Sequence, residues 1–134
     1  MTQATGAAMT LEWKDSYQLG YPSLDAEHEL AFKLLNQFIA AQDQAEQTVA
    51  AMQLYQHTRL HFAHEEALMR ERNFPDAKAH TERHNVLIGR MNVICISIAQ
   101  GEVNKQALLA LMTDWAMCHI AQDDAQFAAF EAAR

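Results

Sequence analysis

The stretch HFAHEEALM, residues 61–69, decides the fold of this chain. It lies in a longer run in which inward positions recur every three or four residues, the pattern of one face of an amphipathic α-helix. His61 and Glu65 occupy two of these positions, where core leucines would be expected. The stretch therefore predicts a helix whose buried face carries an imidazole and a carboxylate one turn apart.

Three other segments show the same period, so the chain has four such segments in all. The first begins at the start signal Pro22–Ser23 and has inward positions Leu24, His28, Phe32, Leu35 and Ile39. The second, which contains the quoted stretch, follows a polar break over residues 42–47 and ends near residues 72–75. The third has inward positions Ala77, His80, His84, Leu87, Met91, Cys95 and Ile98, and stops at Gly101. The fourth starts near the N-cap Asn104 and carries Leu108, Met112, Trp115, His119 and Gln126.

Four such helices joined by short loops predict an all-α fold, an antiparallel up-down-up-down four-helix bundle. We place the bundle at residues 23–134 as a single domain, since the chain has 134 residues. Residues 1–22 are expected to form an N-terminal tail, up to residue 10, and then an arm with Trp13, Tyr17 and Tyr21. No pattern typical of a strand is found.

Composition excludes several classes of function. The net charge of −7 argues against nucleic acid or an anionic membrane as partner, because both require basic surfaces. No run of about 18 apolar residues is present, so no membrane insertion is expected. The N-terminus lacks the features of a signal peptide, and we expect a cytoplasmic protein. Cys95 and Cys118 are interpreted as reduced core residues.

Histidine is the residue that stands out, because five imidazoles fall on inward positions. One such histidine is usually a hydrogen-bonded core residue, but five imidazoles and a carboxylate facing one small core would cost several kcal/mol unless something binds them. A metal site explains all of them together, and bundle cores host such sites. The inward histidines are His28, His61, His80, His84 and His119.

The ligand types narrow the choice of metal. The sequence has no CxxC pair for zinc or iron–sulfur, no CxxCH for covalent haem and no HExxH zinc-protease motif. The Glu-x-x-His of carboxylate-rich di-iron bundles is also absent. A histidine-rich site with bridging carboxylates suits iron best among redox metals that bind dioxygen.

The combined motifs resemble the bacterial hemerythrins over about residues 11–130. The resemblance rests on Leu24–His28 (LDAEH), His61–Met69, His80–His84 (HTERH), Trp115–Ile120 (WAMCHI) with Asp124, and on Trp13 and Gly20 in the arm. It implies two iron ions, one held by His80, His84 and His119 and the other by His28 and His61. Glu65 and Asp124 would bridge them together with an oxo or hydroxo group. The second iron would then have one open position, where dioxygen would bind, beside a pocket lined by Trp115 and Ala116.

Two positions need comment. Regular helix geometry places Asp123, four residues after His119, nearer that histidine than Asp124. The resemblance favours Asp124, so we expect a local distortion, such as a π-type bulge, over residues 119–124. Ala116 stands where the family usually has a bulky aliphatic residue, and we expect a roomier, wetter pocket and faster autoxidation.

The function implied by the resemblance is reversible dioxygen binding, for transport, storage or sensing. The alternative is an oxygen- or redox-sensing input domain of a larger signalling protein, such as a diguanylate cyclase or chemoreceptor. An enzyme is not expected, because no acid–base group is recognisable beyond the metal site. His57 and His64 are expected at the surface or its boundary, and Glu66 in solvent or beside a ligand. Asp25 could cap the first helix or orient a ligand, and both roles remain open.

Overall fold

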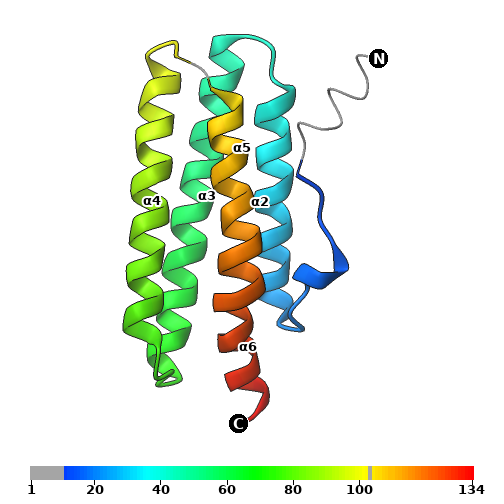
Figure 1. Cartoon of the computed structure of the whole chain (residues 1–134), viewed down its shortest axis with the longest axis vertical. Coiled ribbons are helices and arrows are strands. Elements are labelled where there is room, and N and C mark those ends of the chain that lie inside the picture. Colours follow the sequence, from blue (N-terminus) through cyan, green and yellow to red (C-terminus); the bar gives the residue numbers. More distant parts are fainter. Residues whose placement is uncertain (1–10, 103) are drawn as a thin grey trace.

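A computed structural model describes residues 11–102 and 104–134 of the protein, and in them the chain forms a bundle of long helices (Figure 1). The helices are α2 (Pro22–Ala40), α3 (Gln44–Glu71), α4 (Ala77–Ala99) and a fourth rod. The fourth rod is α5 (Lys105–Asp114), the π-helix η2 (Trp115–Asp124) and α6 (Ala125–Ala132) in succession. The described residues include no strand and no helix long and apolar enough to cross a membrane.

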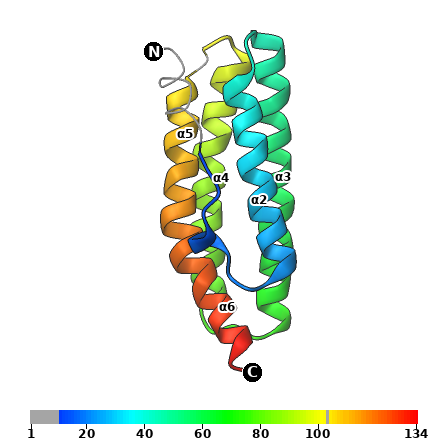
Figure 2. The same cartoon turned by 90° about the vertical axis from the view of Figure 1, so that its right-hand side faces the viewer.

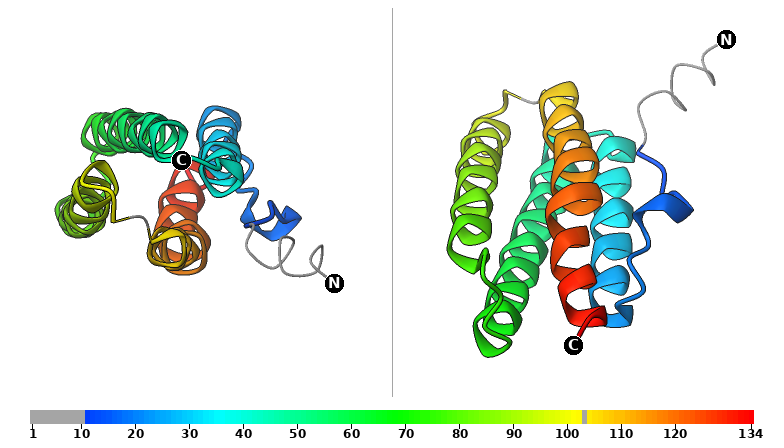
Figure 3. Two further views of the ribbon diagram at one scale, coloured as in Figure 1. Left: turned by 90° about the horizontal axis from the view of Figure 1, so that it is seen from above. Right: turned by 60° about the horizontal axis from the view of Figure 1, so that its bottom comes forward.

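Consecutive helices run antiparallel and pack as neighbours around the bundle. Contacts join α2 to α3, α3 to α4, α4 to α5 and α5 back to α2. The view along the bundle shows these four rods surrounding a common centre (Figure 3). The predicted all-α, up-down-up-down four-helix bundle is therefore confirmed.

The helix ends follow local sequence signals. Asn104 caps α5, with its side chain accepting a hydrogen bond from Ala107 N at 3.0 Å. Gly101 has a φ of +91°, the left-handed conformation that ends α4 and favours glycine. Asp43 caps α3 by accepting from Glu46 N at 2.8 Å, so the polar break before this helix is shorter than predicted.

The arm before α2 packs along the side of the bundle and contains the short 3₁₀ turn η1 (Asp15–Tyr17) (Figure 2). Its rings of Trp13 and Tyr17 pack against Phe32 of α2, at centroid distances of 5.2 and 5.3 Å. Asp25 accepts hydrogen bonds from Leu19 N at 2.8 Å and Gly20 N at 3.1 Å. Asp25 thus fixes the arm to α2 rather than contacting a histidine. The tail predicted over residues 1–10 lies outside the described residues.

The apolar core is divided into two clusters. The larger one fills the half of the bundle that holds the α2–α3 loop, and it includes Leu35, Phe38, Leu54, Ile98 and Leu108. The smaller one lies near the α3–α4 turn and consists of Leu24, Met69, Phe74 and Phe127. Along each helix, the inward histidines fall between residues of the two clusters, so a polar layer separates two apolar ones.

Two sequence predictions for the fourth rod were wrong. Gln126 is exposed and Phe127 is fully buried in its place. The stripe was extrapolated at the period of a regular α-helix, and the π-helix shifts every later residue by one position. Cys118 is exposed rather than buried, whereas Cys95 is in the core as predicted, and both cysteines are free.

Candidate metal centre

The polar layer consists of five imidazoles and two carboxylates, and none of these residues is more than 2% exposed. Each of the four rods contributes at least one of them. They are His28 of α2, His61 and Glu65 of α3, His80 and His84 of α4, and His119 and Asp124 of η2. The structure therefore brings together all seven residues that the sequence singled out.

The histidine Nε2 atoms converge on the oxygens of the two carboxylates. Nε2 of His80 lies 2.9 Å from Glu65 Oε1 and 3.0 Å from Asp124 Oδ1. Nε2 of His84 lies 2.9 Å from the same oxygen of Glu65. Nε2 of His28 lies 2.9 Å from Asp124 Oδ2. Glu65 and Asp124 thus occupy the middle of the layer, with imidazoles on several sides.

Two overlapping sets of these residues could each hold a metal ion. In each set, one candidate ligand atom from every residue lies within 4.8 Å of all the others. The first set is Glu65, His80, His84, His119 and Asp124; the second is His28, His61, Glu65 and Asp124. The sets share both carboxylates, so the arrangement offers two adjacent positions with carboxylates common to both.

The π-helix places Asp124 in this layer. Asp124 Oδ1 lies 3.1 Å from His119 Nε2, although five residues separate the two along the chain. In a π-helix, whose hydrogen bonds run from i to i+5, the wider turn brings residues five apart closer to the same side than an α-helix does. The distortion predicted over residues 119–124 is present and extends over the whole of Trp115–Asp124. Asp123 lies instead at the edge of the layer, 20% exposed.

Several buried atoms of the layer have geometry that suits a cation better than a hydrogen bond. His61 Nε2 and Glu65 Oε2 are buried with no hydrogen-bond partner among the described residues. His28 Nε2 and Asp124 Oδ2 approach to 2.9 Å, yet neither atom is in hydrogen-bonding geometry. Nε2 of His84 and Nε2 of His119 lie only 2.8 Å apart. Lone pairs that converge in this way are what metal ions require, so the residues present fit a metal pair.

Without metal, the same charges perturb the protonation of the layer. Burial disfavours the charged form of His119, but Asp124, Asp123 and Glu65 outweigh it and raise the pKa of His119 to about 11. Burial and the charge of Asp124 oppose ionisation of Glu65, yet hydrogen bonds with the surrounding histidines lower its pKa to about 2. The layer thus favours an ionised Glu65 and a protonated His119, and metal ions would replace the proton.

Three of the five imidazoles also contact a further carboxylate through Nδ1, on the side of the ring that faces away from the layer. His61 Nδ1 lies 2.6 Å from Glu27 Oε1, and His84 Nδ1 lies 2.7 Å from Glu66 Oε2. His119 Nδ1 lies 3.1 Å from Asp123 Oδ2. The sequence analysis predicted Glu66 in solvent or beside a ligand, but it predicted no contact between an imidazole Nδ1 and Glu27 or Asp123. Each of these carboxylates directly precedes or follows a residue of the layer, which is the signal that could have identified them.

The two remaining histidines lie outside the layer, as predicted. His64 is half-exposed, and its Nδ1 lies 2.9 Å from the second oxygen of Glu27. His57 Nε2 lies 2.8 Å from the backbone oxygen of Glu27. Both histidines therefore contact Glu27, the residue whose carboxylate contacts His61 Nδ1.

Trp115 and Ala116, the predicted pocket residues, are both buried beside the layer. The indole ring of Trp115 lies 5.7 Å from the imidazole of His28, centroid to centroid, in an edge-to-face arrangement. Ala116 has no exposed surface and belongs to the larger apolar cluster. The indole ring of Trp115 also lies 5.7 Å from the ring of Phe32, so it packs against two residues of α2.

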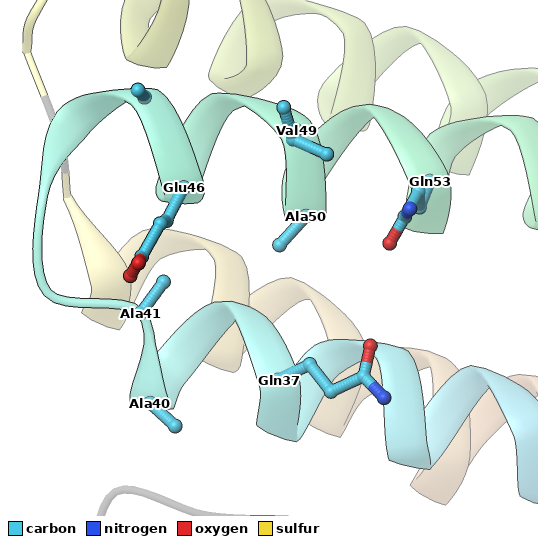
Figure 4. Close-up of a pocket in the computed structure, with 8 residues that line it drawn as sticks. Gln37, Ala40, Ala41, Glu46, Val49, Ala50 and Gln53 are labelled. Atoms are coloured by element: carbon cyan, nitrogen blue, oxygen red, sulfur yellow. The ribbon is translucent and has the colours of Figure 1, made fainter.

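Surface grooves lie on both sides of α4 and reach imidazoles of the layer. One of about 420 Å³ is lined by His119, Cys118 and Arg83, and one of about 230 Å³ by His84, Phe62 and Glu66. A groove of about 600 Å³ between the end of α2 and the start of α3 is lined mainly by alanines, Val49 and glutamines (Figure 4). No imidazole lines this last groove, so it is not part of the candidate metal centre.

Comparisons with known proteins identify relatives of this chain. The chain is 29% identical to a bacteriohemerythrin of Stenotrophomonas maltophilia, over 88% of this chain and 79% of that protein. It is 29% identical to a bacteriohemerythrin of Pseudomonas aeruginosa, over 87% of this chain and 78% of that protein. It is 28% identical to a myohemerythrin of Riftia pachyptila, over 81% of this chain and 82% of that protein. Residues 19–130 match the family described as the hemerythrin HHE cation binding domain, and the chain therefore belongs to that family.

Proposed function

We propose that this protein binds dioxygen reversibly at a pair of iron ions in the polar layer, for transport, storage or sensing of oxygen. Membership of the hemerythrin family and the buried cluster of imidazoles and carboxylates support the proposal. Imidazole and carboxylate ligands suit iron, and no cysteine lies in the layer to favour softer metals.

Seven residues would hold the metals. His80, His84 and His119 would bind one iron, and His28 and His61 the other. Glu65 and Asp124 would bridge the two, together with an oxo or hydroxo group. Both carboxylates are shared by the two sets of candidate ligands, which supports a bridging role for them.

The observation that carries the proposal is the unequal size of the two ligand sets. The first set has five residues, three of them histidines, and the second set has four residues, two of them histidines. With equal contributions from a bridging group, an iron held by the second set would have one protein ligand fewer and would keep a position for a small molecule. An iron pair with such a position can supply the electrons for reversible binding of dioxygen.

Trp115 and Ala116 would shape the space beside that position. Trp115 lies against His28, a member of the smaller ligand set, and is almost fully buried. The buried indole of Trp115 would exclude water from that space, which would favour release of the bound molecule over irreversible oxidation of the irons, whereas the small methyl of Ala116 would leave room for water.

The test is a cycle of reduction, oxygenation and degassing with visible absorption recorded throughout, and with iron quantified on the same sample. We expect two irons per chain and a charge-transfer band that forms with oxygen and fades on degassing. If no band forms, or if it collapses to the ferric state without recovering, reversible binding is wrong.

A further inference from the structure

The imidazoles of the layer differ in the group that their Nδ1 atom contacts. Nδ1 of His61, His84 and His119 each faces a carboxylate oxygen, at distances from 2.6 to 3.1 Å. Nδ1 of His28 and Nδ1 of His80 are buried without a hydrogen-bond partner among the described residues. We call Glu27, Glu66 and Asp123 the outer carboxylates. Three of the five imidazoles therefore have an additional contact with a carboxylate, and two do not.

The position of each outer carboxylate follows from the helix geometry. Each is the immediate neighbour in sequence of a layer residue, so its side chain points to one side of the layer; for Glu27 and Glu66, in α-helices, the offset is about 100° and leads toward the adjoining helix. Glu27 of α2 thereby reaches His61 of α3, and Glu66 of α3 reaches His84 of α4. Asp123 reaches His119, four residues earlier in its own rod. Two of the three contacts therefore tie neighbouring helices together at the layer.

These contacts fix the tautomer of the imidazoles. An ionised carboxylate can only accept a hydrogen bond, so each of the three Nδ1 atoms must carry the proton. Once metal ions replace the protons of the layer, the lone pair of each Nε2 atom would be directed away from the outer carboxylate and toward the metal.

We propose that Glu27, Glu66 and Asp123 are positioning residues that orient His61, His84 and His119 toward the metals and whose negative charges favour the ferric over the ferrous state. The inference rests on the proposed metal ligands. A carboxylate behind a ligand imidazole makes the imidazole a stronger donor, which stabilises the higher charge. Among the residues that the structure describes, Asp123 is the one of the three that pairs with an arginine, at 3.0 Å from Arg83 Nε, so its effect on the potential should be the smallest.

Paired variants separate the two parts of the proposal. Glu27→Gln, Glu66→Gln and Asp123→Asn keep an oxygen that accepts from Nδ1 but remove the charge. The corresponding alanine variants remove both. Glu29→Gln is the matched control, because Glu29 is an exposed carboxylate next to His28. The side chains of Glu27, Glu66 and Asp123 are 20% to 28% exposed, so the Gln and Asn variants should fold, with circular dichroism as the check.

The first readout is the affinity of the metal-free protein for Co²⁺, followed by its visible spectrum. We expect the alanine variants to bind Co²⁺ about ten- to a hundredfold more weakly than the wild type, and the Gln and Asn variants to lie closer to it. Alanine variants that bind as tightly as Glu29→Gln would overturn the positioning role.

The second readout is the midpoint potential of the iron-loaded protein. It should rise in Glu27→Gln and Glu66→Gln, rise less in Asp123→Asn, and stay unchanged in Glu29→Gln. Unchanged potentials in the first two would overturn the role of charge. Neither readout involves dioxygen. If the Co²⁺ affinities and potentials change as expected but no reversible oxygen band forms, only the proposed function is refuted. If the oxygen band is intact but the Co²⁺ affinities and potentials of the variants are unaltered, only this inference is refuted.

Discussion

Asp123 and Asp124 contact opposite edges of one imidazole. Asp123 Oδ2 lies 3.1 Å from Nδ1 of His119, and Asp124 Oδ1 lies 3.1 Å from Nε2 of the same ring. Consecutive residues can do this because η2 is a π-helix, in which the fifth residue after His119 returns to the side facing the layer. The two aspartates therefore have different roles, one inside the layer and one at its edge.

The first prediction separates these roles by metal content. Asp124→Ala should lose the stable metal pair, because Asp124 belongs to both ligand sets and contacts His28, His80 and His119. Asp123→Asn should keep two metals per chain, since the amide oxygen can still accept from His119 Nδ1. The measurement is iron per chain by elemental analysis after loading and desalting. A full iron pair in Asp124→Ala would contradict the bridging position.

Much of this site could be predicted because each inward residue is marked by the helical period. His28, His61 and Glu65 interrupt apolar stripes, and the structure buries all three. Periodicity alone could not place Asp124, because a regular helix favours Asp123; the family resemblance supplied that choice. The same assumption of regularity led to Gln126 instead of Phe127.

The outer carboxylates could not be predicted from the period. A carboxylate one position from an inward residue looks the same in sequence whether it faces solvent or the next helix. Only the packing of α2 against α3 shows that Glu27 meets His61, at 2.6 Å. The exposure of Cys118 is a similar case, since its position in a helical pattern does not tell which side of the π-helix it occupies.

The second prediction concerns the stability of the metal-free protein against pH. The pKa of His119 is raised from 6.5 to about 11, so its protonation stabilises the fold fully below pH 6.5 and this contribution is lost as pH rises toward 11. The pKa of Glu65 is lowered from 4.5 to about 2, so its contribution is complete above pH 4.5 and is lost as pH falls toward 2. Both contributions to stability are complete only between the ordinary pKa values of the two groups, that is, from pH 4.5 to 6.5.

Urea unfolding of the metal-free protein at about pH 5.5 and about pH 9 tests this. The free energy of unfolding should be lower at the higher pH, and the difference should shrink in His119→Gln, which cannot take up the proton. A variant with the same pH dependence as the wild type would show that His119 is not the group responsible.

The third prediction concerns the thiols. Cys118 is exposed at the groove beside His119, whereas Cys95 is buried and burial raises the pKa of its thiol. A thiol reagent at neutral pH should therefore label one cysteine per folded chain quickly and the second only after denaturation. Cys118→Ser should remove the fast reaction. Two thiols reacting at equal rates in the folded protein would contradict the described burial.

The last prediction uses Ala116, which is fully buried three residues before His119 and next to Trp115. A leucine there adds three carbons to a filled region, so Ala116→Leu should lower stability by about 1–3 kcal/mol, seen as a lower Tm of the iron-loaded protein. The larger side chain should also keep water from the pocket, and autoxidation of the oxygenated protein should slow. Ala116→Val should fall between the wild type and leucine in both measurements. A lower Tm with an unchanged autoxidation rate would mean that Ala116 serves only to pack the core and does not control access to the irons.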